Sequence, residues 1–206
     1  MSVKKSEIFF FVVDGVKKYL EMENFVFKKQ VNVFWITYSH TLFALKFEPF
    51  RFNTEDSFHF TIVVGLYDPV YADIVSQNKR SKKMCDCMVT KDLFDFGARK
   101  EGFKIKNNSS VDAMVNDVVR VLEKYYISFI RKMSIPIEKR LFLMNGKHDL
   151  ILQLTYCCYL LLDNKIDIAR KILEEKRYLI NDYWMKKIFE SKQSELKDLM
   201  STGKLV

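Results

Sequence analysis

The sequence is poor in the residues that carry acid–base, thiol and metal chemistry, with three histidines and four cysteines among 206 residues. It has only six glycines and three prolines, which excludes collagen-like chains and turn-dense all-β folds. It contains no G-x-S-x-G motif, Walker A loop or dinucleotide-binding fingerprint, so nucleophile elbows and phosphate-cradling loops are not indicated. These absences favour a binding protein over an enzyme.

Apolar and aromatic residues, in contrast, are abundant. Hydrophobic residues make up 49% of the chain and aromatic residues 15%, including 18 phenylalanines, which excludes an intrinsically disordered protein. A chain of this length buries about 70% of its unfolded surface, so it can build a core without disulfides or a metal. The sequence predicts a compact protein that contains helices.

The net charge of +8 is spread along the chain except for one dense basic run. This run consists of Lys79, Arg80, Lys82 and Lys83. It is either a solvated loop or a site that attracts phosphate or an acidic partner, since neighbouring like charges sum their fields. The run contains no aromatic residue, so it lacks the stacking element of a single-strand nucleic-acid site.

The N-terminal segment superficially resembles a secretory signal, because two lysines precede the apolar run from Ile8 to Val13. Glu7 and Asp14 bracket that run, and no small-residue cleavage site follows. The longest near-apolar stretch, Leu150 to Leu162, is shorter than the ~20 residues of a membrane span. Because the cysteines form no disulfide-framework pattern, we expect a cytoplasmic protein that does not bind membranes.

Hydrophobic periodicity predicts an α+β fold in the first part of the chain. Apolar positions at helical spacing follow Ser6, which we expect to cap the first helix. Alternation of period two then indicates three strands with connections at residues 38–41 and 53–57, short enough only for an antiparallel meander. Weaker strand candidates are residues 84–90 and 102–106.

From Val111 the helical spacing returns, with Ser109 as the expected capping residue. One side of this central helix is apolar, and its residues are Val111, Met114, Val115, Val118, Leu122, Tyr125, Phe129 and Met133.

Residues 136–206 are predicted to form an all-helical C-terminal subdomain. The segment 149–162 has hardly a polar face, so it is expected to be a core helix. Asp163 and Asn164 connect it to a second helix whose apolar face includes Ile168, which predicts an αα-hairpin. We therefore expect an α+β domain over residues 1–135, with its antiparallel β-meander packed against the N-terminal and central helices, and this helical extension after it.

Several motifs resemble an uncharacterised domain family, DUF4304, over about residues 5–135. The resemblance is carried by Phe25, the segment Phe27 to Lys29, the aromatic pair Phe34 and Trp35, the strand end Val64-Gly65-Leu66-Tyr67, the segment Cys85-Asp86-Cys87 and the helix from Val111. The resemblance implies an α+β fold. It supplies no activity and no catalytic residue.

The histidines and cysteines do not form a recognisable catalytic or metal-binding pattern. His59-Phe60-Thr61 gives one of the two His-x-Thr/Ser motifs that a two-histidine phosphoesterase needs, and no second copy is present. Cys85-x-Cys87 and the adjacent Cys157 and Cys158 fit none of the common zinc spacings, so we expect no metal and no cofactor. A small hydrolase or transferase around His59 or Cys85 is an alternative that requires a second titratable group beside one of them.

The favoured function is therefore non-catalytic binding of another protein, for instance to neutralise that protein. Its surface would combine the basic run with exposed aromatic residues, among which Trp35, Tyr38, Phe50 and Phe52 are candidates unless helices cover that face of the sheet. His59 points to the same face and is a candidate contact. Nucleic-acid binding through the basic surface is the other alternative.

Overall fold

A computed structural model describes residues 4–29, 32–54, 58–75, 87–99, 101–106, 109–146 and 149–175, with 190, 191, 193, 194, 196–198 and 201. The chain divides into two compact units. The first, here called the sheet unit, consists of residues 1–67 and 83–134, and the second, the helical unit, of residues 68–82 and 135–206. The sequence predicts a boundary at 135/136, beside this division, but places residues 68–82 with the first domain.

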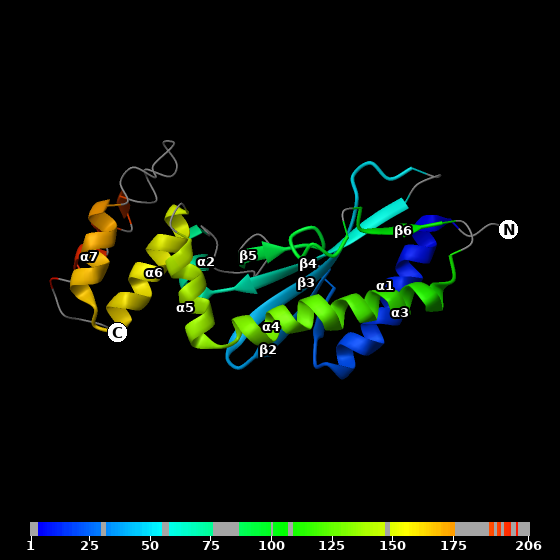
Figure 1. The fold of residues 1–206 in the computed structure, drawn as a ribbon, viewed down its shortest axis with the longest axis horizontal. Helices are drawn as coiled ribbons and strands as arrows, with labels where there is room; N and C mark the ends of the chain where they lie inside the picture. Colours follow the sequence, from blue (N-terminus) through cyan, green and yellow to red (C-terminus); the bar gives the residue numbers. More distant parts are fainter. Residues whose placement is uncertain are drawn as a thin grey trace. The chain divides into compact units, whose positions relative to one another are not determined.

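The sheet unit contains a six-stranded antiparallel sheet (Figure 1). Strands β1 to β5 follow one another in spatial order, and β6 pairs with the opposite end of β4 from β5. The strands are β1 (Val26–Lys28), β2 (Val33–Tyr38), β3 (Thr41–Pro49), β4 (Phe58–Tyr67), β5 (Cys87–Lys91) and β6 (Phe103–Ile105). The predicted antiparallel meander within an α+β fold is confirmed.

Apolar side chains occupy every second position along the strands, so they gather on one face of the sheet, which forms the core. The register places Phe34 opposite Leu45 and Leu45 opposite Val64, so one row of apolar side chains crosses three strands. Helix α1 (Lys5–Met22) packs here, since the ring of Phe9 lies 5.1 Å from that of Phe60. The buried residues of this face include Phe34, Ile36, Phe43, Leu45, Phe47, Phe60, Ile62, Val64 and Leu66.

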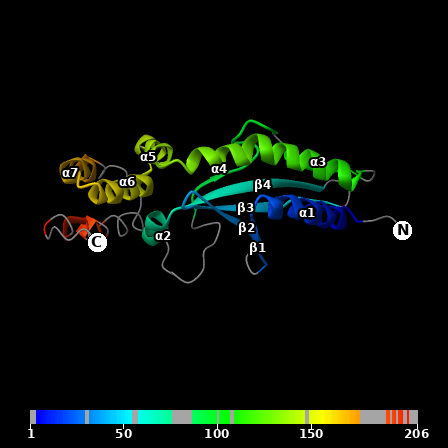
Figure 2. The same cartoon turned by 90° about the horizontal axis from the view of Figure 1, so that it is seen from below.

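A second row of helix in the same layer, beside α1, consists of α3 (Val111–Val121), the π-helical turn η2 (Leu122–Ile127) and α4 (Ser128–Met133). These segments follow one another in a line along the sheet (Figure 2). The hydroxyl of the buried Tyr126 donates to the carbonyl oxygen of Ile62, with 2.5 Å between the two oxygens. This hydrogen bond connects the central helix to β4. Helix α3 also packs on α1, and Gly15 permits that approach, since a Cβ there would lie 2.7 Å from Val115 Cγ2.

The π turn changes which side chains of the central helix are buried. A regular helical period predicts that Tyr125 and Phe129 follow Leu122 on the buried side, but the buried residues are Tyr126 and Ile130. Hydrogen bonds from i to i+5 fit an extra residue into one turn. Tyr126 and Ile130 are therefore each one residue later in the sequence than the buried positions that a regular helix would give. The predicted positions of Tyr125 and Phe129 are therefore wrong, and both are only half-buried.

Both predicted N-caps are also displaced. Lys4, not Ser6, is the N-cap of α1, and its backbone N–H donates to Glu7. Ser110, not Ser109, caps α3 and accepts from Ala113. The hydroxyl of Ser109 instead accepts from the backbone N–H of Lys106, since serine can also close a turn before a helix.

The helical unit contains α2 (Pro69–Val75), α5 (Pro136–Asn145), α6 (Leu150–Leu162) and α7 (Ile166–Glu175). The predicted core helix is confirmed, since nine of the thirteen residues of α6 are buried. Asn164, with φ of 59°, forms the tight connection to α7 and completes the predicted αα-hairpin. Ile168 is exposed, contrary to the prediction, because Ala169 and Leu173 form the buried side of α7.

Among the described residues, no helix combines the length and the hydrophobicity that crossing a membrane requires.

Candidate functional site

The residues singled out from the sequence lie in different environments. Lys79, Arg80, Lys82 and Lys83 lie outside the described residues, as does Cys85. Trp35 and Tyr38 lie on β2, and His59 lies on β4.

Trp35 is not available as a surface anchor, because it is only 3% exposed. It lies on the sheet face opposite α1, in a cluster with Val33, Ala44 and Cys87, and its ring meets that of Tyr67 edge-on at 6.2 Å. Its indole nitrogen is buried without a hydrogen-bond partner. The second face of the sheet thus has an apolar cluster of its own.

The ring of His59 has both a polar and an aromatic neighbour. Its Nδ1 lies 3.2 Å from the carbonyl oxygen of Glu101, and its ring stacks on Phe50 with centroids 6.0 Å apart. Phe52, on the same connection between β3 and β4, is 92% exposed, and Tyr38 is exposed at the turn between β2 and β3. Of the expected aromatic anchors, Phe50, Phe52 and Tyr38 reach solvent. In the part of the chain that is described, no three histidine, cysteine or acidic side chains gather as metal ligands.

An exposed apolar surface lies on α5 of the helical unit. Ile137 is 65% exposed, Leu141 42% and Met144 40%. These positions are separated by four and three residues, so the side chains form one row along the helix. The other side of α5 is anchored to α6, since Leu143 is buried and its carbonyl oxygen accepts from the side chain of Gln153.

This row borders a hollow of about 100 Å³ between α5 and α6, here called the α5–α6 groove. Tyr156 and Leu160 line it from α6. Small-molecule pockets have volumes of about 300–1,000 Å³, so this groove is too small for a typical cofactor. Its size suits one or two apolar side chains presented by another protein.

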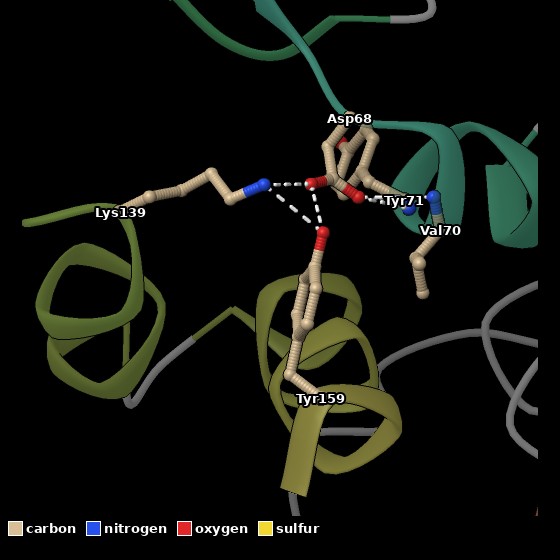
Figure 3. Close-up of polar contacts among 5 residues, drawn as sticks. All are labelled: Asp68, Val70, Tyr71, Lys139 and Tyr159. Carbon is tan, nitrogen blue, oxygen red and sulfur yellow. Dashed lines mark hydrogen bonds and ion pairs between the residues drawn. The ribbon is translucent and has the colours of Figure 1, made fainter. Parts of the chain in front are cut away.

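A partly buried polar cluster fixes the two helices beside the groove (Figure 3). Asp68, fully buried, accepts from Lys139 of α5 at 2.8 Å and from the hydroxyl of Tyr159 of α6 at 2.6 Å. Its other oxygen accepts from the backbone N–H groups of Val70 and Tyr71, which caps α2. One carboxylate therefore links α2, α5 and α6, and we call Asp68, Lys139 and Tyr159 the clamp.

The clamp changes the ionisation of two of its members. Burial alone would lower the pKa of Lys139, but its hydrogen bonds to Asp68 and Tyr159 raise that pKa overall. Burial raises the pKa of Tyr159, and its hydrogen bond to Asp68 raises it further. At neutral pH the clamp therefore holds an ammonium and a neutral phenol around the carboxylate, which is a positioning arrangement.

Charged side chains form one edge of the groove. Arg140 pairs with Asp163 through both terminal guanidinium nitrogens and lies over the ring of Tyr159, 5.7 Å from its centroid. Lys165 lies beyond them on the connection to α7 and is exposed. This edge carries two cations against one carboxylate, so its net charge is positive.

This groove is not among the sites predicted from the sequence. The spacing of Ile137, Leu141 and Met144 directly after Pro136 is a signal that periodicity could have found. The clamp had no such signal, since its hydrogen bonds join residues 71 and 91 positions apart.

No protein-family model matches the chain, and no similar curated protein or solved structure was found. The resemblance to the DUF4304 family therefore stays a prediction.

Proposed function

We propose that the protein is a non-catalytic binding module whose α5–α6 groove holds an amphipathic helix of a partner protein. The observation that carries this proposal is the exposed apolar row of Ile137, Leu141 and Met144 beside a hollow of about 100 Å³. Grooves between rigid helices bind amphipathic helices through apolar anchors spaced three and four residues apart. Occupying a functional helix of the partner is a direct way to neutralise it.

The charges around the groove favour an acidic partner helix. At this edge the two positive charges of Arg140 and Lys165 outnumber the one negative charge of Asp163, and the whole chain has a net charge of +8. Complementary charge accelerates association and selects among partners more than it strengthens the final complex. We therefore expect a partner helix with an aliphatic stripe flanked by aspartate or glutamate.

The clamp supports this function because it makes the groove rigid before a partner arrives. Lys139 and Tyr159 hold α5 and α6 to the same buried carboxylate. A preformed groove loses less conformational entropy on binding than a flexible one.

Cys87, Cys157 and Cys158, the cysteines among the described residues, are thiols rather than disulfide partners, which supports the proposal that the protein acts in the reducing cytoplasm. The contacts of the His59 ring with a backbone carbonyl oxygen and a phenyl ring do not by themselves support a hydrolase there.

The test combines covalent capture with a matched pair of substitutions. A photo-crosslinking amino acid at Met144 in the full chain identifies the partner and the segment that touches the groove. With the purified partner, Ile137→Glu is expected to weaken binding at least tenfold, because a carboxylate would have to be buried in an apolar contact. Ile168→Glu is the control, since Ile168 is also exposed but lies on α7 and does not line the groove.

Three results would contradict the proposal. One is equal binding by both variants, and another is crosslinking only to a non-helical or basic segment. The third is self-association of the pure protein that Ile137→Glu abolishes, because the groove would then bind a second copy of this chain. Unchanged circular dichroism of both variants shows that a loss of binding does not come from unfolding.

A further inference from the structure

The sheet unit contains a second, larger hollow with an excess of positive charge. Its volume is about 310 Å³, and it lies between the segment after β5 and the α3–η2 part of the central helix. Arg99, Arg120 and Lys124 line it together with a single carboxylate, Asp117. Its volume is at the lower end of the ~300–1,000 Å³ range of small-molecule pockets.

Asp117 positions both arginines. Its carboxylate accepts from Arg99 at 2.5 Å and from Arg120 at 2.7 Å. Burial alone would raise the pKa of Asp117, but the two guanidinium groups lower it overall, so the carboxylate is ionised at neutral pH. Three cations against one anion leave a net charge of about +2, which matches a phosphate dianion.

The arginines retain donors for a ligand. A guanidinium has five N–H donors in a rigid fork, more than one shared carboxylate can accept. A cation–π contact also fixes Arg99, because its guanidinium lies over the ring of Phe103, 4.5 Å from the centroid. Two guanidinium groups fixed beside each other are typical of phosphate recognition.

The π turn supplies an aromatic wall. Tyr125 lies within η2 and lines the hollow, whereas a regular helix would place it on the buried side. The ammonium of Lys124 lies 5.1 Å from the centroid of the Tyr125 ring. Single π turns inside α-helices often occur at functional sites. Here the turn places a phenol ring next to the basic groups.

We propose that this hollow binds a mononucleotide, with the phosphate on Arg99, Arg120 and Lys124 and the base against Tyr125. The volume, the net charge and the aromatic wall all favour a small ligand that combines a dianion with a flat ring. This site is independent of the α5–α6 groove and extends the function beyond protein binding.

Calorimetric titration of the full chain with AMP, adenosine and inorganic phosphate tests the proposal. AMP is expected to bind at least tenfold more tightly than adenosine, which lacks the dianion, and more tightly than phosphate, which lacks the ring. Arg120→Gln and Lys124→Gln are each expected to weaken AMP binding about fivefold or more. Arg120 is exposed, so this change leaves the fold intact.

Arg170→Gln is the matched control. Arg170 pairs with an aspartate three residues before it, as Arg120 does, but lies on α7. Its variant should bind AMP as the unsubstituted chain does. Equal affinities for AMP and adenosine, an unchanged affinity in Arg120→Gln, or no binding of AMP at millimolar concentration would each overturn the proposal.

A nucleic-acid strand offers the same phosphate and base chemistry, so single-stranded oligoadenylate is titrated in parallel. If the oligonucleotide binds with a steep dependence on salt while AMP does not bind, the hollow contacts a strand and the mononucleotide proposal fails. If AMP binds and competes with the oligonucleotide, the free nucleotide is supported.

Discussion

Tyr126 shows how one polar side chain can stabilise an apolar core. Its ring is buried against Phe96, and its hydroxyl donates to the carbonyl oxygen of Ile62 within the sheet. Burial raises the pKa of Tyr126 far above its usual value, with smaller contributions from Asp92 and Asp95. The phenol therefore stays neutral and keeps its proton available to Ile62 over the physiological range.

Replacing Tyr126 with phenylalanine tests this contact. The ring remains, but the carbonyl of Ile62 loses its donor in a place without solvent. We expect the free energy of unfolding to fall by about 1–3 kcal/mol, the cost of leaving a buried polar group unsatisfied. Urea denaturation measures this change. Tyr38→Phe is the control, since Tyr38 is exposed, and an equal loss in both variants would contradict the role given to Tyr126.

At the scale of elements, the packing of α1 on α3 depends on the absence of a side chain at Gly15. Glycine inside a helix costs about 0.5–1 kcal/mol relative to alanine, so its presence here needs a reason. That reason is the short distance to Val115, 2.7 Å from the position that a Cβ would take. Close approach of the two helices thus outweighs helix propensity.

This argument predicts a change of sign in a double-mutant cycle. Gly15→Ala alone is expected to lower the free energy of unfolding by about 1 kcal/mol, because overpacking costs about 1–3 kcal/mol and the propensity gain offsets part of it. In a chain that carries Val115→Ala, the same change should stabilise by about 0.5–1 kcal/mol. Thermal or urea unfolding of the four chains measures the coupling. The packing explanation fails if Gly15→Ala has the same effect in both backgrounds.

The elements that could be predicted from the sequence are those whose pattern is local. Alternation identified β3 and β4, and continuous apolarity identified α6, because each reflects burial of neighbouring residues. Tyr125 was misplaced because a π turn leaves no mark in a 3.6-residue period. Neither the clamp nor the pairing of Arg99 with Asp117 could be predicted, since both depend on residues that only the tertiary fold brings together.

At the scale of the whole molecule, both units contain groups whose pKa is raised in the folded state. In the sheet unit, burial raises the pKa of Tyr19 to about 12, with contributions from Glu123 and Glu23. In the helical unit, the hydrogen bonds of the clamp raise the pKa of Lys139, and burial together with the hydrogen bond to Asp68 raises the pKa of Tyr159. The unfolded chain releases these protons near the ordinary values, about 10 for tyrosine and 10.4 for lysine.

The stability that the groups with raised pKa values contribute should therefore fall as the pH rises above their ordinary pKa values, because the unfolded state then binds fewer protons than the folded state. The loss begins at about pH 8.5 with the Cys157 thiol, whose pKa burial raises to about 12, and continues above about pH 10 with the tyrosines and Lys139. For Tyr19 this loss extends through its folded pKa of about 12. Urea midpoints at a series of pH values measure the effect for the whole chain. Tyr159→Phe should be less stable at pH 8, since Asp68 loses a donor, but should lose less stability between pH 9 and 11. A midpoint that rises above pH 10, or an equal alkaline loss in Tyr159→Phe and the unsubstituted chain, would show that the clamp does not hold its protons more tightly when folded.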